Sequence, residues 1–201
     1  MGAIPILLIA WPALAAAVLP CIRDRRVRGA AVYGAAAGVM ALAAALLAAW
    51  LAGGGGRVEL YAETKLADHA MLAGELVLMA LVILLSVRHR KYPIILLSAG
   101  QTLLVAWCEL NHPTAPAAHM RLDGLAMLLC IIAAFVGGLI CIYAVGYMKG
   151  YHEHHEEFID RSGFFFSMLF LFLAAMFGLV LSENLVWMYF FWEITSVVSF
   201  L

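Results

Sequence analysis

One carboxylate stands alone in the last eighteen residues of the chain. The run from Asn184 to Leu201, NLVWMYFFWEITSVVSFL, contains no charged residue except Glu193. On a helix, Glu193 would lie roughly 14 Å past Asn184, near the middle of a hydrocarbon core about 30 Å thick. Placing an acid there costs on the order of 2.5–3.5 kcal/mol on insertion scales, and such acids commonly serve a proton path, an ion path or a buried partner. We therefore take Glu193 as the candidate functional residue, with a structural hydrogen bond to a neighbouring helix as the alternative.

Two other acidic positions have adequate structural explanations. Glu75 would lie about 8 Å into its predicted span, so we expect its side chain to reach the headgroup region or a water molecule. Asp123 directly precedes a long apolar run. An acid at that position can cap the first free N–H groups of a helix and meet the positive end of its dipole.

The run HEHHEE at residues 152–157 contains residue types that bind zinc or nickel. No cysteine or distant histidine completes a set with recognisable ligand spacing. His154 and His155 are adjacent and cannot share one helix face. We therefore favour a solvated interfacial loop and expect no metal site.

The sequence predicts no cofactor within this chain. It contains no dinucleotide-binding glycine motif, Walker A motif or nucleophile motif. The four cysteines lie in or beside apolar runs without C-x-x-C spacing, which is typical of small apolar fillers rather than disulfides or cluster ligands. The aromatic run YFFW at residues 189–192 is more typical of packing than of a quinone site.

Membrane-spanning helices must position these residues. The chain has 201 residues, of which 66% are hydrophobic and 12% charged, whereas soluble domains carry about 25% charged residues. The net charge of −1 argues against nucleic acid as a partner. The composition predicts an all-α fold, a polytopic transmembrane helix bundle. Uncharged runs of about 20 residues predict seven spans, at residues 2–22, 29–52, 70–87, 93–108, 124–147, 163–182 and 184–201.

The distribution of basic residues predicts the orientation. The turns at residues 23–28 and 88–91 hold four and three Arg or Lys residues, whereas the loops at 57–69 and 109–123 hold two and one. The positive-inside rule therefore places the N-terminus outside and the two basic turns, with the loop at 149–161, in the cytoplasm. The last span ends abruptly at Leu201 without a polar anchor, so we expect the natural chain to continue.

Residues 121–201 resemble a family of antiporter-like membrane subunits. The resemblance rests on RLDGLAMLL at the start of one span, AVGYMKGYHEHHEEF at its end, and the run FFFSMLFLFLAAMFGLVLSENLVWMYFFWEITSVVSFL. The family includes the L-type subunit of respiratory complex I, subunits of energy-converting membrane hydrogenases and the large subunit of Mrp-type Na⁺/H⁺ antiporters. The chain then divides into a four-span region with basic cytoplasmic turns, residues 1–110, and the start of the antiporter-like module, residues 111–201.

The resemblance implies a role for Glu193. In that family, the Glu of the Trp-Glu pair is the essential intramembrane acid of a proton channel, and it matches Glu193 here. Family members pair it with a Lys on a later helix, beyond Leu201. The resemblance implies a proton-carrying, ion-translocating subunit of a redox-driven complex in the prokaryotic inner membrane, with no redox centre of its own.

The resemblance also implies partners, and it leaves alternatives open. The partners would be other membrane subunits and peripheral iron–sulfur or nickel–iron subunits. The complex would be of the energy-converting hydrogenase type or the NADH:quinone oxidoreductase type, and the extra spans at 70–108 favour the former. The alternatives are a subunit of a Mrp-type Na⁺/H⁺ antiporter and a scaffold in which Glu193 makes only a helix–helix hydrogen bond.

Overall fold

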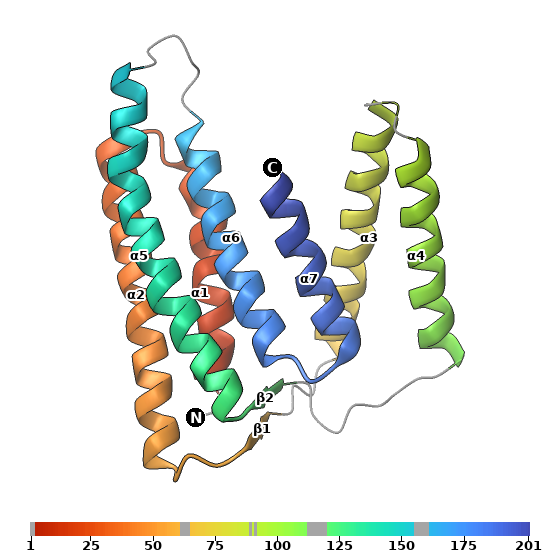
Figure 1. Ribbon diagram of the computed structural model, residues 1–201, viewed down its shortest axis with the longest axis horizontal. Helices are drawn as coiled ribbons and strands as arrows, with labels where there is room; N and C mark the ends of the chain where they lie inside the picture. Colours follow the sequence, from red (N-terminus) through yellow and green to blue (C-terminus); the bar gives the residue numbers. More distant parts are fainter. Residues whose placement is uncertain (1–2, 61–64, 89, 91, 112–119, 155–160) are drawn as a thin grey trace.

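The computed structural model describes residues 3–60, 65–88, 90, 92–111, 120–154 and 161–201 (Figure 1). In chain order its elements are α1 (Ile4–Val18), the 3₁₀ turn η1 (Leu19–Cys21), α2 (Arg25–Ala52), β1 (Val58–Leu60), α3 (Lys65–Arg88), α4 (Tyr92–Asn111), β2 (Met120–Leu122), α5 (Gly124–His154), α6 (Ser162–Leu181) and α7 (Leu185–Phe200). Successive helices run in alternating directions along the bundle (Figure 1). The predicted all-α bundle is confirmed.

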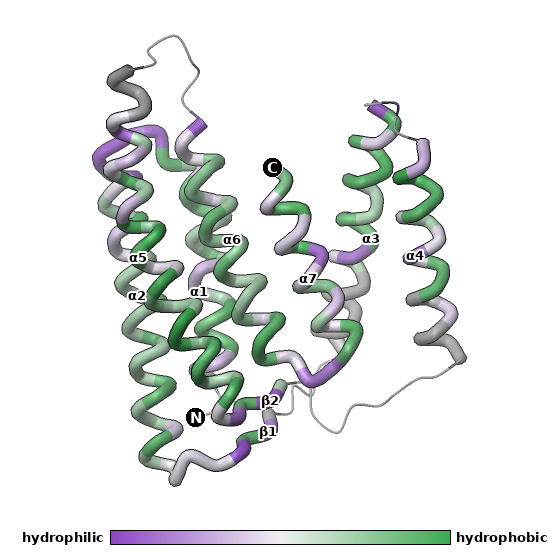
Figure 2. Tube along the Cα trace, viewed as in Figure 1, coloured by the Kyte–Doolittle hydropathy of each residue, from purple (hydrophilic) through white to green (hydrophobic). Residues whose placement is uncertain are grey.

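Among the described residues, four helices are long and apolar enough to cross a membrane: Ile4–Cys21, Arg25–Ala52, Gly124–Gly150 and Ser162–Leu181. Two shorter apolar stretches, Tyr92–Leu104 and Leu185–Phe200, accompany them. Figure 2 shows hydrophobic residues along the helices and hydrophilic residues gathered mainly at their ends. The chain is therefore a multi-pass membrane protein.

Several helices extend beyond the uncharged runs that predicted them. α2 begins at Arg25 inside the basic turn, because the Asp24 side chain accepts hydrogen bonds from the backbone N–H groups of Arg26, at 2.7 Å, and Val27, at 3.3 Å. α3 begins at Lys65 rather than at residue 70. α5 continues to His154, so the first half of the predicted loop at 149–161 is helical. The side chains of residues 152–157 lie outside the described part.

α2 ends at Ala52, the predicted end of its span, where a run of glycines follows. Gly54 and Gly55 have φ values of 86° and 68°, which glycine adopts without steric penalty. The indole N–H of Trp50 donates to the Gly56 carbonyl at 2.8 Å and holds the turn against the end of the helix.

A core of four helices, α1, α2, α5 and α6, forms the larger part of the bundle. α2 contributes a face of small and branched side chains, all with 0% exposure: Val32, Ala36, Val39, Ala43 and Leu46. Small residues let helix backbones approach closely, which drives helix association where lipid is as apolar as the side chains. Cys130 and Cys141 are free thiols buried in this core, as predicted for apolar fillers.

Polar contacts tie the core together near the basic end. The buried Arg28 guanidinium donates to the Ile22 carbonyl at 3.1 Å and to the Ser162 hydroxyl at 2.5 Å, so it joins the α1–α2 turn to the start of α6. The Ser167 hydroxyl donates to the Ala16 carbonyl at 2.6 Å. The buried donors of Arg28 and Ser167 therefore have partners in neighbouring elements, as a low-dielectric interior requires.

α7 packs between this core and a separate hairpin of α3 and α4 (Figure 1). On the core side, a Cβ atom at Gly178 of α6 would lie 2.4 Å from the Phe191 ring of α7. On the hairpin side, a Cβ atom at Gly74 of α3 would lie 2.6 Å from the Phe190 ring. Two glycines thus create the space into which adjacent rings of α7 fit.

Substitution of Gly178 tests this packing. We expect Gly178→Ala to lower the free energy of unfolding by about 1–3 kcal/mol, the range of overpacking substitutions. Gly146→Ala on α5 is the matched control, because a Cβ atom there meets nothing within 4 Å. The control should be neutral or stabilising by up to about 1 kcal/mol, from helix propensity. Thermal unfolding in detergent measures both, and equal melting temperatures for the two variants would contradict this account.

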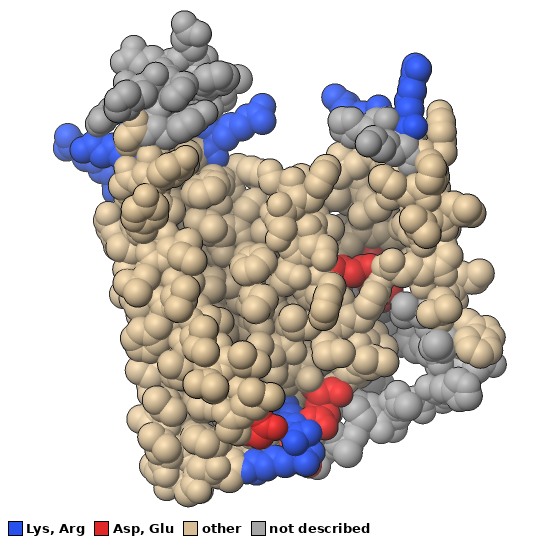
Figure 3. Space-filling model, viewed as in Figure 1, with Lys and Arg blue, Asp and Glu red and all other residues tan. Residues whose placement is uncertain are grey.

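The basic turns lie at one end of the bundle. Figure 3 shows Lys and Arg side chains gathered at the upper end, over the α1–α2 turn and the α3–α4 turn, and a mixed group of both signs at the lower end. The antiparallel pair β1 and β2 closes the lower end, with Glu59 opposite Arg121. This arrangement agrees with the alternation on which the predicted orientation depends.

Thiol labelling tests which end faces the cytoplasm. In an otherwise cysteine-free chain, Glu59→Cys should react with a membrane-impermeant reagent in intact cells. Lys149→Cys, at the opposite end, should react only after permeabilisation. Ready labelling of position 149 from outside would reverse the orientation.

Candidate functional site

The start of α7 sets the position of Glu193. Asn184 caps this helix: its side-chain oxygen accepts from the Val186 N–H at 2.9 Å, and its carbonyl accepts from the Met188 N–H, also at 2.9 Å. Glu193 follows Leu185 by eight residues, about 12 Å along the helix axis. The acid therefore lies at the middle of α7.

Glu193 lies on the side of α7 opposite the core. The buried residues of α7 are Trp187, Phe191 and Val198, which share one face at four- and seven-residue spacing. At about 100° per residue, Glu193 lies about 200° from Phe191 around the helix. It therefore points away from α6, toward the side that the hairpin occupies.

Two side chains donate hydrogen bonds to Glu193. Tyr189, one turn earlier on α7, donates its hydroxyl to Glu193 Oε1. Gln101 of α4 donates its amide Nε2–H to the same oxygen. Glu193 is half-buried and faces these two side chains. Leu185 and Trp192, on the same helix, are 73% and 61% exposed.

The sequence analysis did not identify Gln101 as a partner of Glu193. A signal was present, because Gln101 and Thr102 are a pair of polar residues within an otherwise apolar run. Which helix such a residue faces depends on tertiary packing, and the periodicity of one helix does not contain that information.

The expectation that Glu75 reaches the headgroup region is wrong, and the alternative contact with a water molecule stays a prediction. Its side chain does not reach the headgroup region: Glu75 is only 5% exposed. Because α3 begins at Lys65, Glu75 lies ten residues into a helix of 24. It is therefore an interior acid, on the helix that contacts α7 through Gly74.

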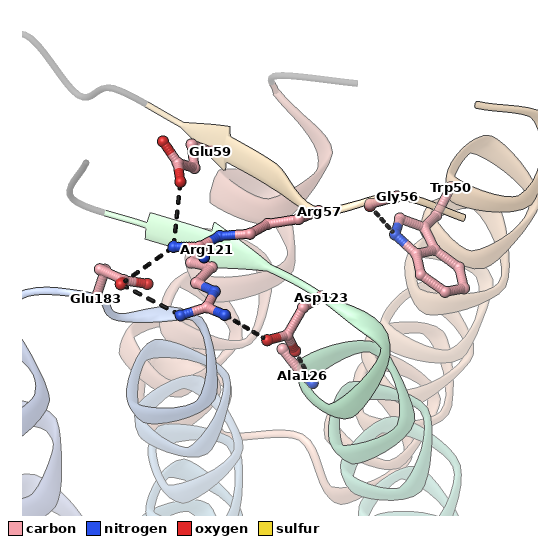
Figure 4. A network of polar contacts seen from close by, with 8 residues as sticks. All are labelled: Trp50, Gly56, Arg57, Glu59, Arg121, Asp123, Ala126 and Glu183. Atoms are coloured by element: carbon pink, nitrogen blue, oxygen red, sulfur yellow. Dashed lines mark hydrogen bonds and ion pairs between the residues drawn. The ribbon is translucent and has the colours of Figure 1, made fainter. Parts of the chain in front are cut away.

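A second group of charged residues lies at the lower end of the bundle (Figure 4). Arg57 pairs with Glu59 at 3.1 Å and with Glu183 at 3.6 Å. Arg121 pairs with Asp123 at 3.2 Å and with Glu183 at 3.4 Å. Glu183 thus joins the β1 and β2 strands to the α6–α7 turn. These pairs are partly exposed, so each contributes little to stability.

Asp123 caps α5, as predicted. Its carboxylate accepts from the Ala126 N–H at 2.9 Å, and its carbonyl accepts from the Met127 N–H at 2.9 Å. The Ala126 hydrogen bond is the largest cause of a lowered pKa for Asp123; the nearby Arg121 and Arg57 also lower it, against partial desolvation. A shallow pocket of about 200 Å³ lies beside Asp123, bordered also by Arg121 and Glu183. The ion pairs among its charged residues indicate a structural anchor for the end of the bundle.

No group of three or more His, Cys, Asp or Glu residues with metal-binding geometry occurs in the part of the chain that the structure describes. The HEHHEE run falls outside that part. The expectation that no metal or cofactor binds therefore stays a prediction.

Comparisons with known proteins agree with this architecture. Residues 107–159 match the family described as NADH-Ubiquinone oxidoreductase (complex I), chain 5 N-terminus. The Na(+)/H(+) antiporter subunit A1 of Staphylococcus haemolyticus (strain JCSC1435) is 40% identical over 82 residues, which cover 41% of this chain and 9% of the relative. The subunit A1 of Staphylococcus aureus (strain JH9) is 39% identical over 82 residues, with the same coverage.

The matched part of the chain is similar to the antiporter-like membrane subunits, the family that the sequence resembles. The match spans 9% of the length of these curated relatives. Glu193 lies beyond the residues 107–159 that match the complex I family.

The capping role of Asp123 can be tested through its pH dependence. The lowered pKa means that Asp123 stabilises the folded chain above the usual carboxyl pKa of about 3.9. This stabilisation is lost as the pH falls from there through the lower folded-state pKa. Asp123→Asn keeps a cap oxygen and should lose only this pH-dependent part. Asp123→Ala should also melt at a lower temperature at pH 7. Identical melting curves for wild type and Asp123→Ala at pH 7 would contradict the assignment.

Proposed function

We propose that this chain carries the first part of an ion-translocating module, in which Glu193 takes up and releases a proton. The observation that supports the proposal is the Glu193 carboxylate itself. It lies at the middle of the apolar helix α7, half-buried, and it accepts hydrogen bonds from Tyr189 and Gln101.

The two hydrogen bonds suggest how such a group would work. Both end on the same carboxylate oxygen, Oε1. Burial favours the neutral acid, whereas hydrogen-bond donors and nearby cations favour the carboxylate. A cation that approaches Glu193 would therefore release its proton, and a cation that withdraws would let a proton return. The family resemblance supplies a candidate for that cation, a Lys on a later helix.

We further propose that the module belongs to a redox-driven complex related to complex I, of the hydrogenase or the NADH:quinone oxidoreductase type. The match of residues 107–159 to the complex I chain 5 family supports this assignment. Its partners would be other membrane subunits and peripheral subunits that carry iron–sulfur or nickel–iron centres. Electron transfer would take place in those peripheral subunits.

A second candidate is a subunit of a Mrp-type Na⁺/H⁺ antiporter. The relatives named as Na(+)/H(+) antiporter subunit A1 favour it. Purification of the native complex separates the two. Co-purifying iron–sulfur subunits would support the redox-driven complex, and Na⁺/H⁺ exchange by a complex without redox subunits would support the antiporter.

Substitution of Glu193 in the full-length protein within its complex tests the carrier role. Glu193→Gln keeps size and hydrogen-bonding capacity but removes the titratable proton. Ion pumping should therefore fall by about a hundredfold or more, the scale of a lost proton-transfer group, while subunit content stays normal. Glu193→Asp shortens the acid by about 1.5 Å and should retain partial pumping, because a water molecule can fill the gap. Proton translocation in vesicles, measured beside subunit stoichiometry, gives both quantities.

The matched control is Glu59→Gln, which neutralises a carboxylate in the charged group at the end of the bundle. It should pump normally. If Glu193 is only a structural hydrogen-bond acceptor, Glu193→Gln should pump normally as well, and any damage should appear as lost assembly. Normal pumping by Glu193→Gln would end the carrier hypothesis.

A further inference from the structure

A second carboxylate, Glu75, is buried on α3, the helix of the hairpin that packs against α7. Glu75 lies about 15 Å from the start of α3, and Glu193 about 12 Å from the start of α7. Both helices start at the lower end of the bundle (Figure 1). Glu75 is 5% exposed, although burial of a carboxylate carries a desolvation cost. An acid kept at such a position is a candidate for function.

The helices that carry the two acids approach closely at this level. A Cβ atom at Gly74 would lie 2.6 Å from Cε2 and 2.8 Å from Cζ of Phe190. Gly74 is adjacent to Glu75, and Phe190 is adjacent to Tyr189. The closest approach of α3 to α7 therefore brings the backbone around Glu75 toward the segment that holds Tyr189.

The Tyr189 phenol interacts with both acids. It donates a hydrogen bond to Glu193 Oε1. It also lies within electrostatic range of Glu75, as well as of Glu193. In Figure 3, acidic side-chain atoms appear at mid-height where α7 faces the hairpin, far from the charged groups at the two ends.

We propose that Glu75 is a second proton carrier, which exchanges protons with Glu193 through the hydroxyl of Tyr189. This inference rests on the proposed function of Glu193 and extends the path onto α3, outside the residues that match the complex I family. In one transfer, Tyr189 gives its phenolic proton to ionised Glu193 and receives a proton from neutral Glu75, directly or through water. Glu75 is then ionised, Glu193 is neutral, and the tyrosine is unchanged.

The test measures proton translocation in vesicles with the full-length protein in its complex. Glu75→Gln should pump at less than about a tenth of the wild-type rate, with normal subunit content. Tyr189→Phe should fall similarly, because it removes the hydroxyl but keeps the ring. The double variant should be no slower than the slower single variant, since both changes interrupt one path. Glu75→Asp should restore part of the rate, which a role limited to packing would not predict.

Parallel variants distinguish two failures. One is failure of the relay, the proton transfer between Glu75 and Glu193 through Tyr189, and the other is failure of the proposed carrier role of Glu193. Wild-type pumping by Glu75→Gln together with loss in Glu193→Gln would overturn the relay and leave the Glu193 carrier intact. Wild-type pumping by both would overturn the proposed function as well. A Glu75→Gln complex that loses subunits, and that Glu75→Asp does not rescue, would assign Glu75 a structural role and also overturn the relay. Glu59→Gln serves as the neutralised control.

Discussion

A carboxylate inside a membrane protein must find its hydrogen-bond donors within the protein, because lipid supplies none. Glu193 meets this constraint with one donor from its own helix and one from another. Tyr189 lies four residues earlier, a spacing that places two side chains on the same face of a helix. Gln101 comes from α4, on a hairpin that is separate from the four-helix core. The position of the hairpin against α7 therefore determines the surroundings of the acid.

Two adjacent aromatic residues fix the rotation of α7 about its axis. Phe191 fits against Gly178 of α6, and Phe190 fits against Gly74 of α3. The two rings meet edge to face, with centroids 5.4 Å apart. A rotation of α7 would drive one ring into a helix backbone and withdraw the other. Because protein interiors tolerate overpacking poorly, this pair of contacts holds Glu193 on the side of α7 that faces the hairpin.

The sequence predicted the features that depend on local chemistry. The alternating helices, the end of α2 at Ala52 and the Asp123 cap follow from short segments, and the structure confirms them. The helix starts at Arg25 and Lys65 were missed, because a count of uncharged residues stops at the first charge. A helix instead begins where its first free N–H groups find a cap, as Asp24 shows for α2.

The burial of Glu75 and the Gln101 hydrogen bond could not be predicted in the same way. Both depend on which face of the α3–α4 hairpin meets α7, and that choice is made by the fit of Phe190 against Gly74. In isolation, the stretch 70–87 of α3 is apolar apart from one acid, Glu75. Several rotations of the helix would bury equally apolar faces. Contacts between distant parts of the chain decide among such rotations, and the periodicity of a single segment does not report them.

The two hydrogen-bond donors of Glu193 come from different helices, Tyr189 from α7 and Gln101 from α4. The Tyr189 hydrogen bond lies within one helix and moves with it, whereas the Gln101 hydrogen bond crosses between helices. A hydrogen bond to a charged group contributes about 1.5–3 kcal/mol, and it is stronger to the ionised carboxylate than to the neutral acid. If Glu193 carries a proton, as proposed above, this contact would hold the hairpin more tightly when Glu193 is ionised than when it is neutral. The Gln101 hydrogen bond thus links Glu193 to the position of the α3–α4 hairpin.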